Sequence, residues 1–525
     1  MSKSRHTKDH EPPLPLYIGL NVHTLTRSKK MLTQLYEMGM SVSYERTLEV
    51  EDWLTTAVCQ RFEDDDSVCP PQIRDGIFTV GALDNIDHNL SSTTAQGSFH
   101  GISISLFQFP TVTNPGTSRP AITVPPPEHT GTPSLPDNYR IVPDVACNID
   151  GVVVSEAGIS DIDSPDIDSH LEEAKKEEVQ WVQQSIQILS KDTICTDEYI
   201  SWAAYHASHQ PEPTDPIGIS ALLPLFLEKA ATISMVRHGM TIIQRETEKC
   251  NPGQIPVIAL DQPLYALAKY VQWTWPQTFG EASFVVMFGG LHIEMALWMM
   301  VGDLLEGSGW TTALSDVGVA SAGTADSFLH VTHLTRTRHA HQISALSLAK
   351  LQQDACLEKL GPHDEAAFND WKKEMCAKNP TFEYWDIILR LEILVLIFVR
   401  SHRERNFSLF IAVLETLTPW FFALDHPNYA RWIPVHIRDM KSLPDSIRDD
   451  LQKFWVFPKT QRKFSTMPLD QAHEQNNGRV KDTGGAIGLT ENPAAFKRWM
   501  VSGPEQARLL SEFEDQYTTH ETTDT

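Results

Sequence analysis

Cysteine is scarce in this sequence, and its placement argues against the common cysteine-based frameworks. The chain has 525 residues but only seven cysteines, spread from Cys59 to Cys376 with no two in a CxxC pair. Structural zinc sites use closely spaced ligand pairs, and disulfide-stabilised secreted domains use even sets of cysteines. The sequence therefore predicts reduced thiols in a nuclear or cytoplasmic protein, and no zinc finger.

Long apolar runs are also missing. The most apolar stretch, Ile387–Val399, is short and contains Arg390 and Glu392, which predicts a buried core helix and not a membrane span. The first residues are charged and polar, and no apolar segment of the kind found in a signal peptide follows them. We therefore expect a protein that is neither secreted nor associated with a membrane.

Basic residues are outnumbered by acidic ones. The 43 lysines and arginines face 68 aspartates and glutamates, which gives a formal net charge of −25. This balance argues against a protein whose whole surface binds nucleic acid, because such proteins normally have a basic face. A local DNA groove is still compatible with the sequence, since the stretch 400–481 has more basic than acidic residues.

The common catalytic signatures are absent as well. The sequence contains no GxGxxG, P-loop, HExxH or GxSxG motif. This argues against the dinucleotide-binding, P-loop, zinc-protease and α/β-hydrolase classes that carry these motifs. Function has to be sought in the order of the strands and in the acids that follow them.

Two continuous apolar runs predict buried parallel strands. Ile255–Leu260 is the first, and it ends on Asp261 at the carboxyl end, where open α/β sheets place their ligands. A Gln-Pro pair then opens a helix predicted over 263–275. Residues 283–290 predict the second buried strand, which ends in Gly-Gly and is followed by another helix.

An earlier pair of strands is predicted as a hairpin. Residues 76–83 form a strand that ends in Asp84, with Asp87 three residues further on. After a polar turn over 91–97, the run Phe99–Phe109 alternates apolar and polar residues. Such alternation is typical of an antiparallel strand covered on one face only.

The order of these elements predicts the fold. A third strand at 151–155 and a helix over 221–248 complete a series of three antiparallel strands followed by β-α-β crossovers. This is the order of an RNase H-like fold, so we predict an α/β protein whose RNase H-like mixed sheet is interrupted by a large all-helical insertion. The predicted domains are an N-terminal polar tail with short helices (1–75), the first part of the core with a Pro-rich and acidic insertion at about 110–180 (76–310), the helical insertion (311–459), the rest of the core (460–500) and a C-terminal tail (501–525).

Acids occupy three positions of this predicted fold that would converge. They follow the first strand (Asp84 or Asp87), follow the fourth strand (Asp261), and lie on a late helix (Glu474, or Asp470 four residues before it). Convergent carboxylates suit Mg²⁺ or Mn²⁺, which prefer oxygen ligands. Two such ions can activate a water or a 3′-hydroxyl and stabilise the leaving oxygen of a phosphodiester.

The same acids also have a purely structural interpretation. Asp261 is placed to cap the helix that follows it, and Asp84 and Asp87 could organise a turn. The sequence alone leaves both interpretations open.

Five short segments carry a resemblance to a known group of proteins. They are Gly81–Asn89, Ala259–Pro263, Phe288–Met295, Asp425–Arg431 and Asp470–Asn477. In these segments the chain resembles transposon-derived proteins of animal genomes and is similar in layout to DDE-type transposases, whose RNase H core is split by a helical insertion before the final Glu. The resemblance covers about residues 75–510 and implies metal-dependent cleavage or transfer of DNA, with Asp84 or Asp87, Asp261 and Glu474 in the three acidic positions.

Basic side chains near these elements are candidate contacts to DNA phosphate. Arg336 and Arg338 lie in the densest His/Arg cluster of the chain, for which a polar helix face is the alternative. Asn476, Asn477, Arg479 and Lys481 follow Glu474 closely and could contact phosphate near the reacting bond.

Two functions are therefore in competition. The first is a transposase-derived protein, active or decayed, that acts on DNA with Mg²⁺ or Mn²⁺. The second is a non-catalytic scaffold that binds protein partners through its helical region, which the acidic charge and the lack of a DNA-binding module such as a zinc finger favour.

Overall fold

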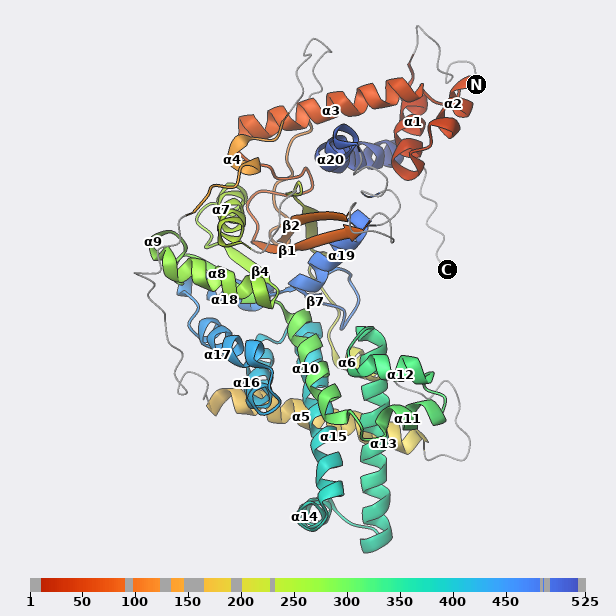
Figure 1. The fold of residues 1–525 in the computed structure, drawn as a ribbon, viewed down its shortest axis with the longest axis vertical. Helices are drawn as coiled ribbons and strands as arrows, with labels where there is room; N and C mark the ends of the chain where they lie inside the picture. The colour runs from red at the N-terminus through yellow and green to blue at the C-terminus, as the bar shows by residue number, and fades with distance from the viewer. Residues whose placement is uncertain are drawn as a thin grey trace. The chain divides into compact units, whose positions relative to one another are not determined.

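The chain forms two compact units, each with its own core (Figure 1). Unit 1 comprises Met1–Val153, Pro216–Val286 and Asp470–Thr525, and unit 2 comprises Val154–Asp215 and Met287–Leu469. The computed structural model describes residues 11–89, 98–122, 134–145, 165–189, 201–226, 232–481, 485 and 492–517.

A five-stranded mixed sheet is the centre of unit 1. Its strands are β1 (Thr79–Asn89), β2 (Ser98–Gln108), β3 (Ile219–Leu222), β4 (Val257–Leu260) and β5 (Val285–Phe288), in the spatial order β3-β2-β1-β4-β5. β2 is antiparallel to both β1 and β3, and β1 is parallel to β4. The chain passes from unit 1 into unit 2 within β5. A mixed α/β architecture, as predicted, is confirmed.

The strands predicted from continuous apolar runs are present. Every residue of β4 and β5 is buried, as expected for strands covered on both faces. The predicted first strand is longer than expected, because β1 does not end before Asp84 but stays paired with β2 as far as Asn89. The turn predicted over 91–97 lies outside the described residues.

The third antiparallel strand, Ile219–Leu222, lies in a region where the sequence predicted the start of a helix. The strand predicted at 151–155 lies outside the described residues. The helix expected over 221–248 begins only with α7 (Ile233–Cys250). Pro224 explains this difference, because proline lacks the backbone donor of a helix and disfavours helical geometry in the residue before it.

α7 packs closely on the sheet, next to α8 (Gln262–Thr274) and the short α9 (Pro276–Phe279). Two glycines on facing elements permit this approach. A Cβ atom at Gly239 of α7 would lie 2.2 Å from Leu83 Cδ1, and one at Gly81 of β1 would lie 2.5 Å from Ile243 Cδ1. Side chains at either position would therefore push helix and sheet apart.

Helices from both ends of the chain pack together in unit 1. They are α1 (Pro13–Thr26), α2 (Lys29–Glu37), α3 (Tyr44–Asp65) and α20 (Pro493–Tyr517). α19 (Leu469–Lys481) contacts strand β2, and the single turn α4 (Asp137–Arg140) follows the sheet hairpin. Leu20, Val50 and Leu54 form a buried cluster that Leu509 and Leu510 contact. The N-terminal segment, expected as a polar tail with short helices, thus contributes to the core, and the expected C-terminal tail begins inside α20.

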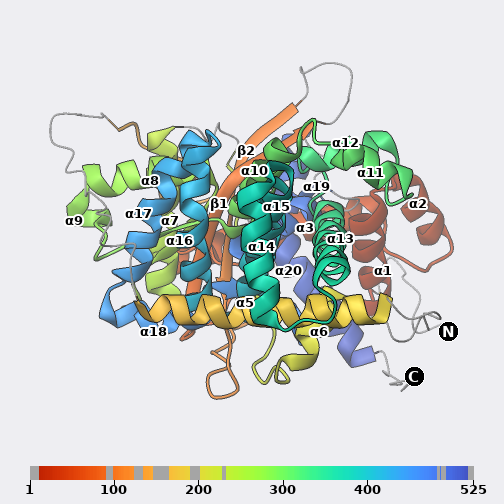
Figure 2. The same ribbon diagram turned by 90° about the horizontal axis from the view of Figure 1, so that it is seen from below.

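Unit 2 is almost entirely helical, as predicted for residues 311–459. Its helices are α5 (Pro165–Leu189), α6 (Trp202–His209), α10 (Gly290–Leu305), α11 (Trp310–Asp316), α12 (Ala322–Leu329), α13 (Leu334–Leu360), α14 (Glu365–Lys378), α15 (Pro380–Glu404), α16 (Phe407–Ala423), α17 (Pro427–Lys441) and α18 (Asp445–Phe454), with a two-stranded ladder of β6 (Val456–Phe457) and β7 (Met467–Pro468). α5 lies across α13, α15 and α16 (Figure 2).

α15 is the core helix that the apolar run predicted. Its central residues, such as Leu391, Val395 and Leu396, are buried, and Glu392 is buried with them. The helical unit is larger than expected, since it begins at Met287 and also includes 154–215. Along the described chain, no helix combines the length and apolar character needed to cross a bilayer.

Candidate functional site

The two predicted strand acids occupy neighbouring positions in the sheet. The parallel pairing of β1 with β4 ends with Leu83 opposite Leu260. Asp84 and Asp261 are the next residues on these two strands, and adjacent strands lie about 4.8 Å apart. The sheet register therefore places both acids at the carboxyl end of β4, where β1 leaves its parallel neighbour and continues with β2 alone.

Asp84 is a buried acid within β1 and not at its end. It lies opposite Ser103 of β2, its side chain is 9% exposed, and its Oδ1 accepts a hydrogen bond of 2.6 Å from the backbone N–H of Asn85. Asp87, the alternative candidate, lies further along β1 opposite His100, and its side chain is outside the described part of the chain.

Asp261 is the N-cap of α8. Its Oδ1 accepts a hydrogen bond of 3.0 Å from the backbone N–H of Leu264, with Pro263 in the first turn of the helix. The capping role that the sequence left open is thus confirmed. A carboxylate cap also satisfies an unpaired helix donor, and it benefits from the partial positive charge of the helix N-terminus.

Glu474 is the acid of α19 that approaches the sheet. A carboxylate oxygen of Glu474 and one of Asp84 lie within 4.8 Å of each other. Asp261 is not a member of this close group. Asp470, four residues before Glu474, is buried with 5% of its surface exposed. The structure thus brings two of the three predicted acids directly together and places the third beside them in the sheet register.

Hydroxyl groups of the sheet fix α19 in this position. His473 lies between two serines of β2, with Nε2 3.0 Å from Ser103 Oγ and Nδ1 2.7 Å from Ser105 Oγ. Asn476 Nδ2 donates to Ser105 Oγ at 2.9 Å and to Ser220 Oγ of β3 at 2.7 Å. Since Glu474 is next to His473 in the chain, these contacts set where its carboxylate lies.

These contacts correct two expectations from the sequence. Ser103 and Ser105 are fully buried, so the polar face of β2 does not face solvent but is covered by α19. Asn476, expected near phosphate, is buried and bonded to serines. The alternating Ser residues of β2 indicated a polar face of the strand, but the sequence did not indicate which element would cover that face.

Burial also sets the charge of His473. Its ring is fully enclosed, and this desolvation lowers the pKa from 6.5 to about 3, with the Asp470 carboxylate opposing the shift. His473 is therefore neutral at pH 7. A neutral ring at this point adds no positive charge to offset the Asp84 and Glu474 carboxylates.

The paired carboxylates have a clear chemical capacity. Two ionised carboxylates at this separation repel each other, so a shared proton or a cation stabilises them. Oxygen ligands of this kind suit Mg²⁺ and Mn²⁺, and Asp84 with Glu474 could supply two of them.

Comparison with known proteins assigns the chain to a family. The sequence model of one family matches residues 201–366 and 362–525, which is more than half of the chain. That family is described as a domain of unknown function (DUF8702). The chain belongs to this family. No curated protein and no solved structure gave a match.

The family match covers only part of the candidate site. It includes Asp261 and Glu474, whereas Asp84 and the strands β1 and β2 precede it. Because the family carries no assigned function, the chemistry of the site has to be argued from its geometry.

The candidate phosphate contacts have different surroundings. In unit 1, Arg479 is exposed and Lys481 is half-buried on the last turns of α19. In unit 2, Arg336 is exposed on α13. Arg338, two residues later, is buried and donates from Nη2 to Glu294 Oε2 at 2.6 Å, with a second contact from Nε to Oε1.

Arg338 therefore differs from its predicted role. Its guanidinium neutralises Glu294 of α10, which also accepts a hydrogen bond of 3.0 Å from Trp298 Nε1. A buried arginine that is bidentate to a buried carboxylate cannot also contact DNA phosphate without leaving that acid unpaired. Arg336, Arg479 and Lys481 are the predicted basic residues that retain exposed surface.

Proposed function

We propose that the sheet of unit 1 is an RNase H-like core of transposase type, which cleaves or transfers DNA strands with the help of Mg²⁺ or Mn²⁺. The observation that carries the proposal is the approach of the Asp84 and Glu474 carboxylates within 4.8 Å, from elements at opposite ends of the chain. A transposable-element origin and a nuclear location belong to the same proposal.

The topology supports the assignment. The spatial order β3-β2-β1-β4-β5, with β1 antiparallel to β2 and parallel to β4, matches the order that the fold class uses. An acid on β1 and one after β4 then lie side by side at the sheet centre, and a late helix brings the third acid across them. α19 is such a helix.

In this proposal the carboxylates of Asp84 and Glu474, which lie closest together, would hold the metal ion. Asp261, which caps α8, would orient the site from the adjacent strand and complete the acidic set. A bound divalent ion would activate a water or a 3′-hydroxyl and stabilise the leaving oxygen of the phosphodiester. Arg479 and Lys481 lie one to two turns after Glu474 and would contact the phosphates beside the reacting bond.

A non-catalytic scaffold is the second candidate. Three leucines of α13 are largely exposed in unit 2, namely Leu351 (64%), Leu357 (52%) and Leu360 (46%). Exposed apolar side chains on one helix favour contact with a partner protein. In this alternative the acids of unit 1 have only structural roles.

Metal binding and strand cleavage test the first candidate. We expect calorimetry to show that Mn²⁺ binds to the full-length wild type. We also expect the wild type to nick supercoiled DNA in the presence of Mn²⁺. Asp84→Asn and Glu474→Gln should each remove both signals, because each replaces an anionic ligand by a neutral amide of similar shape. Asp354→Asn is the matched control, since Asp354 is an exposed acid paired with Lys350 in unit 2.

The outcomes separate the two functions. Loss of Mn²⁺ binding and nicking in both site variants, with both retained in the control, supports the metal-dependent enzyme. A wild type that neither binds Mn²⁺ nor nicks DNA refutes it and leaves the scaffold. Metal binding that survives in both Asp84→Asn and Glu474→Gln also refutes the assigned ligands.

A further inference from the structure

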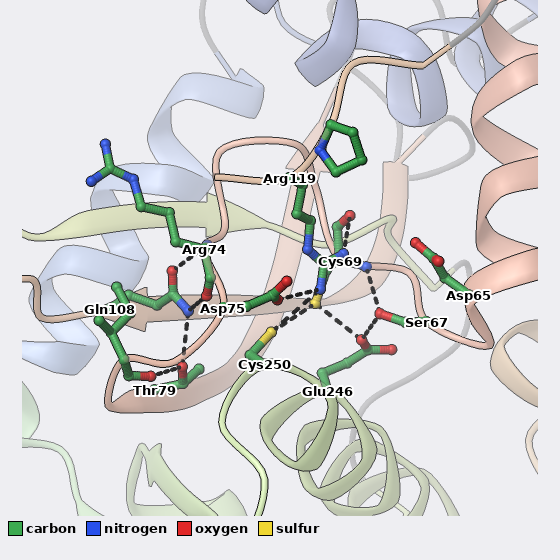
Figure 3. A network of polar contacts seen from close by, with 12 residues as sticks. Asp65, Ser67, Cys69, Arg74, Asp75, Thr79, Gln108, Arg119, Glu246 and Cys250 are labelled. Carbon is green, nitrogen blue, oxygen red and sulfur yellow. Dashed lines mark hydrogen bonds and ion pairs between the residues drawn. The ribbon is translucent and has the colours of Figure 1, made fainter. Parts of the chain in front are cut away.

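Cys69 and Cys250 form a buried pair of thiols in unit 1 (Figure 3). Their Sγ atoms lie 3.5 Å apart, although 181 positions separate the residues in the sequence. Cys69 belongs to the loop after α3, and Cys250 is the last residue of α7. Two thiols in van der Waals contact need only a small movement to form a bond.

A carboxylate faces the first thiol. Glu246, one turn before Cys250 on α7, is fully buried, and its Oε2 lies 3.0 Å from Cys69 Sγ. The same carboxylate accepts from Ser67 Oγ at 2.5 Å and from the backbone N–H of Val68 at 3.0 Å. Glu246 is thus fixed by three donors and placed to take a proton from Cys69.

A guanidinium faces the second thiol. Arg119 Nη2 lies 3.6 Å from Cys250 Sγ, and Nη1 donates to the backbone carbonyl of Cys69 at 3.5 Å. Arg119 also pairs with Asp75 at 3.5 Å. The Arg119 guanidinium is thus the charged donor that faces Cys250, and a cysteine reacts with oxidants as its thiolate. The same charge opposes binding of a metal cation between the two sulfurs.

The two thiols therefore have different roles. Burial, the Cys250 thiol and the Glu246 charge raise the pKa of Cys69 well above its usual range, so Cys69 stays protonated and donates to Glu246. Cys250 faces the Arg119 guanidinium instead, and this geometry assigns it the attack on an oxidant. A base beside one thiol and a cation beside the other is an arrangement that an isolated buried cysteine lacks.

We propose that Cys69 and Cys250 are a redox-modification site at which a peroxide forms an intramolecular disulfide. The Cys250 thiolate attacks one peroxide oxygen, the O–O bond breaks, and the released hydroxide takes up a proton to leave as water. Cys69 sulfur then attacks the sulfenic Cys250 sulfur, forming the S–S bond and breaking the S–O bond. Glu246 accepts the Cys69 proton and passes it to the leaving hydroxide. In total, two thiols lose two electrons to one peroxide, which yields two waters.

The disulfide would connect the segments that lead into two central strands. The carbonyl of Cys250 accepts from the backbone N–H of Gly76 at 2.7 Å, and Gln254 Oε1 accepts from the backbone N–H of Thr79 at 2.9 Å. Oxidation would thus fix the loop before β1 to the end of α7, from which the chain enters β4. This effect does not depend on the proposed DNA chemistry.

The full-length reduced chain tests the proposal with hydrogen peroxide as the oxidant. Peptide mapping without reductant should find a peptide that links residues 69 and 250, and dithiothreitol should reverse the link. Cys69→Ser and Cys250→Ser should each abolish it. Cys356→Ser, which removes a buried cysteine of unit 2, is the matched control and should retain it. Oxidised wild type should unfold at a higher temperature than reduced wild type, and the two serine variants should show no such increase.

The neighbours of the pair provide a second measurement that does not depend on the cysteine variants folding. Arg119→Gln should slow disulfide formation, because it removes the guanidinium that faces the Cys250 sulfur. Three results would overturn the proposal. They are peroxide oxidation of Cys376 without any 69–250 link, a link that forms only in denaturant, and stoichiometric zinc on the reduced chain that is lost in Cys250→Ser.

Discussion

Protonation of His473 should release α19 from the sheet. The hydrogen-bond network defines the tautomer, because Ser103 Oγ already donates to the backbone carbonyl of Asp84 and can accept only from His473 Nε2–H. Nδ1 is then the acceptor for the Ser105 hydroxyl, which itself accepts from Asn476. A second proton at Nδ1 would place two donors against Ser105 and a charge in a fully buried position.

The magnitude of this effect follows from the pKa. The folded-state pKa of His473 is about 3, against 6.5 for the free side chain. The unfolded chain therefore takes up the proton first, and stability is lost as the pH falls from about 6.5 toward 3. Linkage gives a loss of about 2 kcal/mol between pH 7 and pH 5 from this group alone.

Native-state hydrogen exchange can measure the loss where it arises. The free energy of opening of α19 and β2 should fall by this amount in the wild type when the pH is lowered from 7 to 5. In His473→Gln it should be lower than in the wild type at pH 7, by about 1–3 kcal/mol for the unmatched serine partners. The variant should lose this pH dependence, so the difference from the wild type should shrink by about 2 kcal/mol at pH 5. His339→Gln, at an exposed position of α13, is the matched control. An equal fall in His473→Gln and in the wild type would refute the reasoning.

Two further predictions concern packing in unit 2. Arg338→Ala should destabilise unit 2 by about 3–5 kcal/mol, because Glu294 is left buried and unpaired. The control Arg336→Ala, on the same helix, should change the stability measured by calorimetry by less than about 0.5 kcal/mol. Equal effects of the two substitutions would contradict the importance of the buried pair. Gly302→Ala should cost about 1–3 kcal/mol, because its Cβ would lie 2.3 Å from a backbone carbonyl oxygen of the facing helix. Gly323→Ala, where no atom lies within 4 Å, should instead raise the melting temperature.

Local patterns in the sequence were sufficient for most of the secondary structure. Continuous apolar residues located β4 and β5, and Pro263 after Asp261 located the start of α8. The pattern failed around Pro224, where the apolar spacing of a helix also fits a short strand followed by extended chain. The effect of a proline on its neighbours in the chain can be predicted from the sequence, because it acts locally. An apolar spacing that fits both a helix and a strand cannot be assigned from the sequence alone.

The roles of individual polar residues depended on partners far away in the chain. Nothing near Arg338 in the sequence indicates Glu294, and the spacing of Ser103 and Ser105 does not indicate that His473 covers them. Local patterns located an acid in the first strand, another after the fourth strand, and a third on a late helix, although the first strand continues past its acid. The folded chain shows that Asp84 and Glu474 meet and that Asp261 caps a helix. The physical reason is that strand and helix signals arise from short-range periodicity, whereas the meeting of two carboxylates depends on how buried surfaces from distant segments pack.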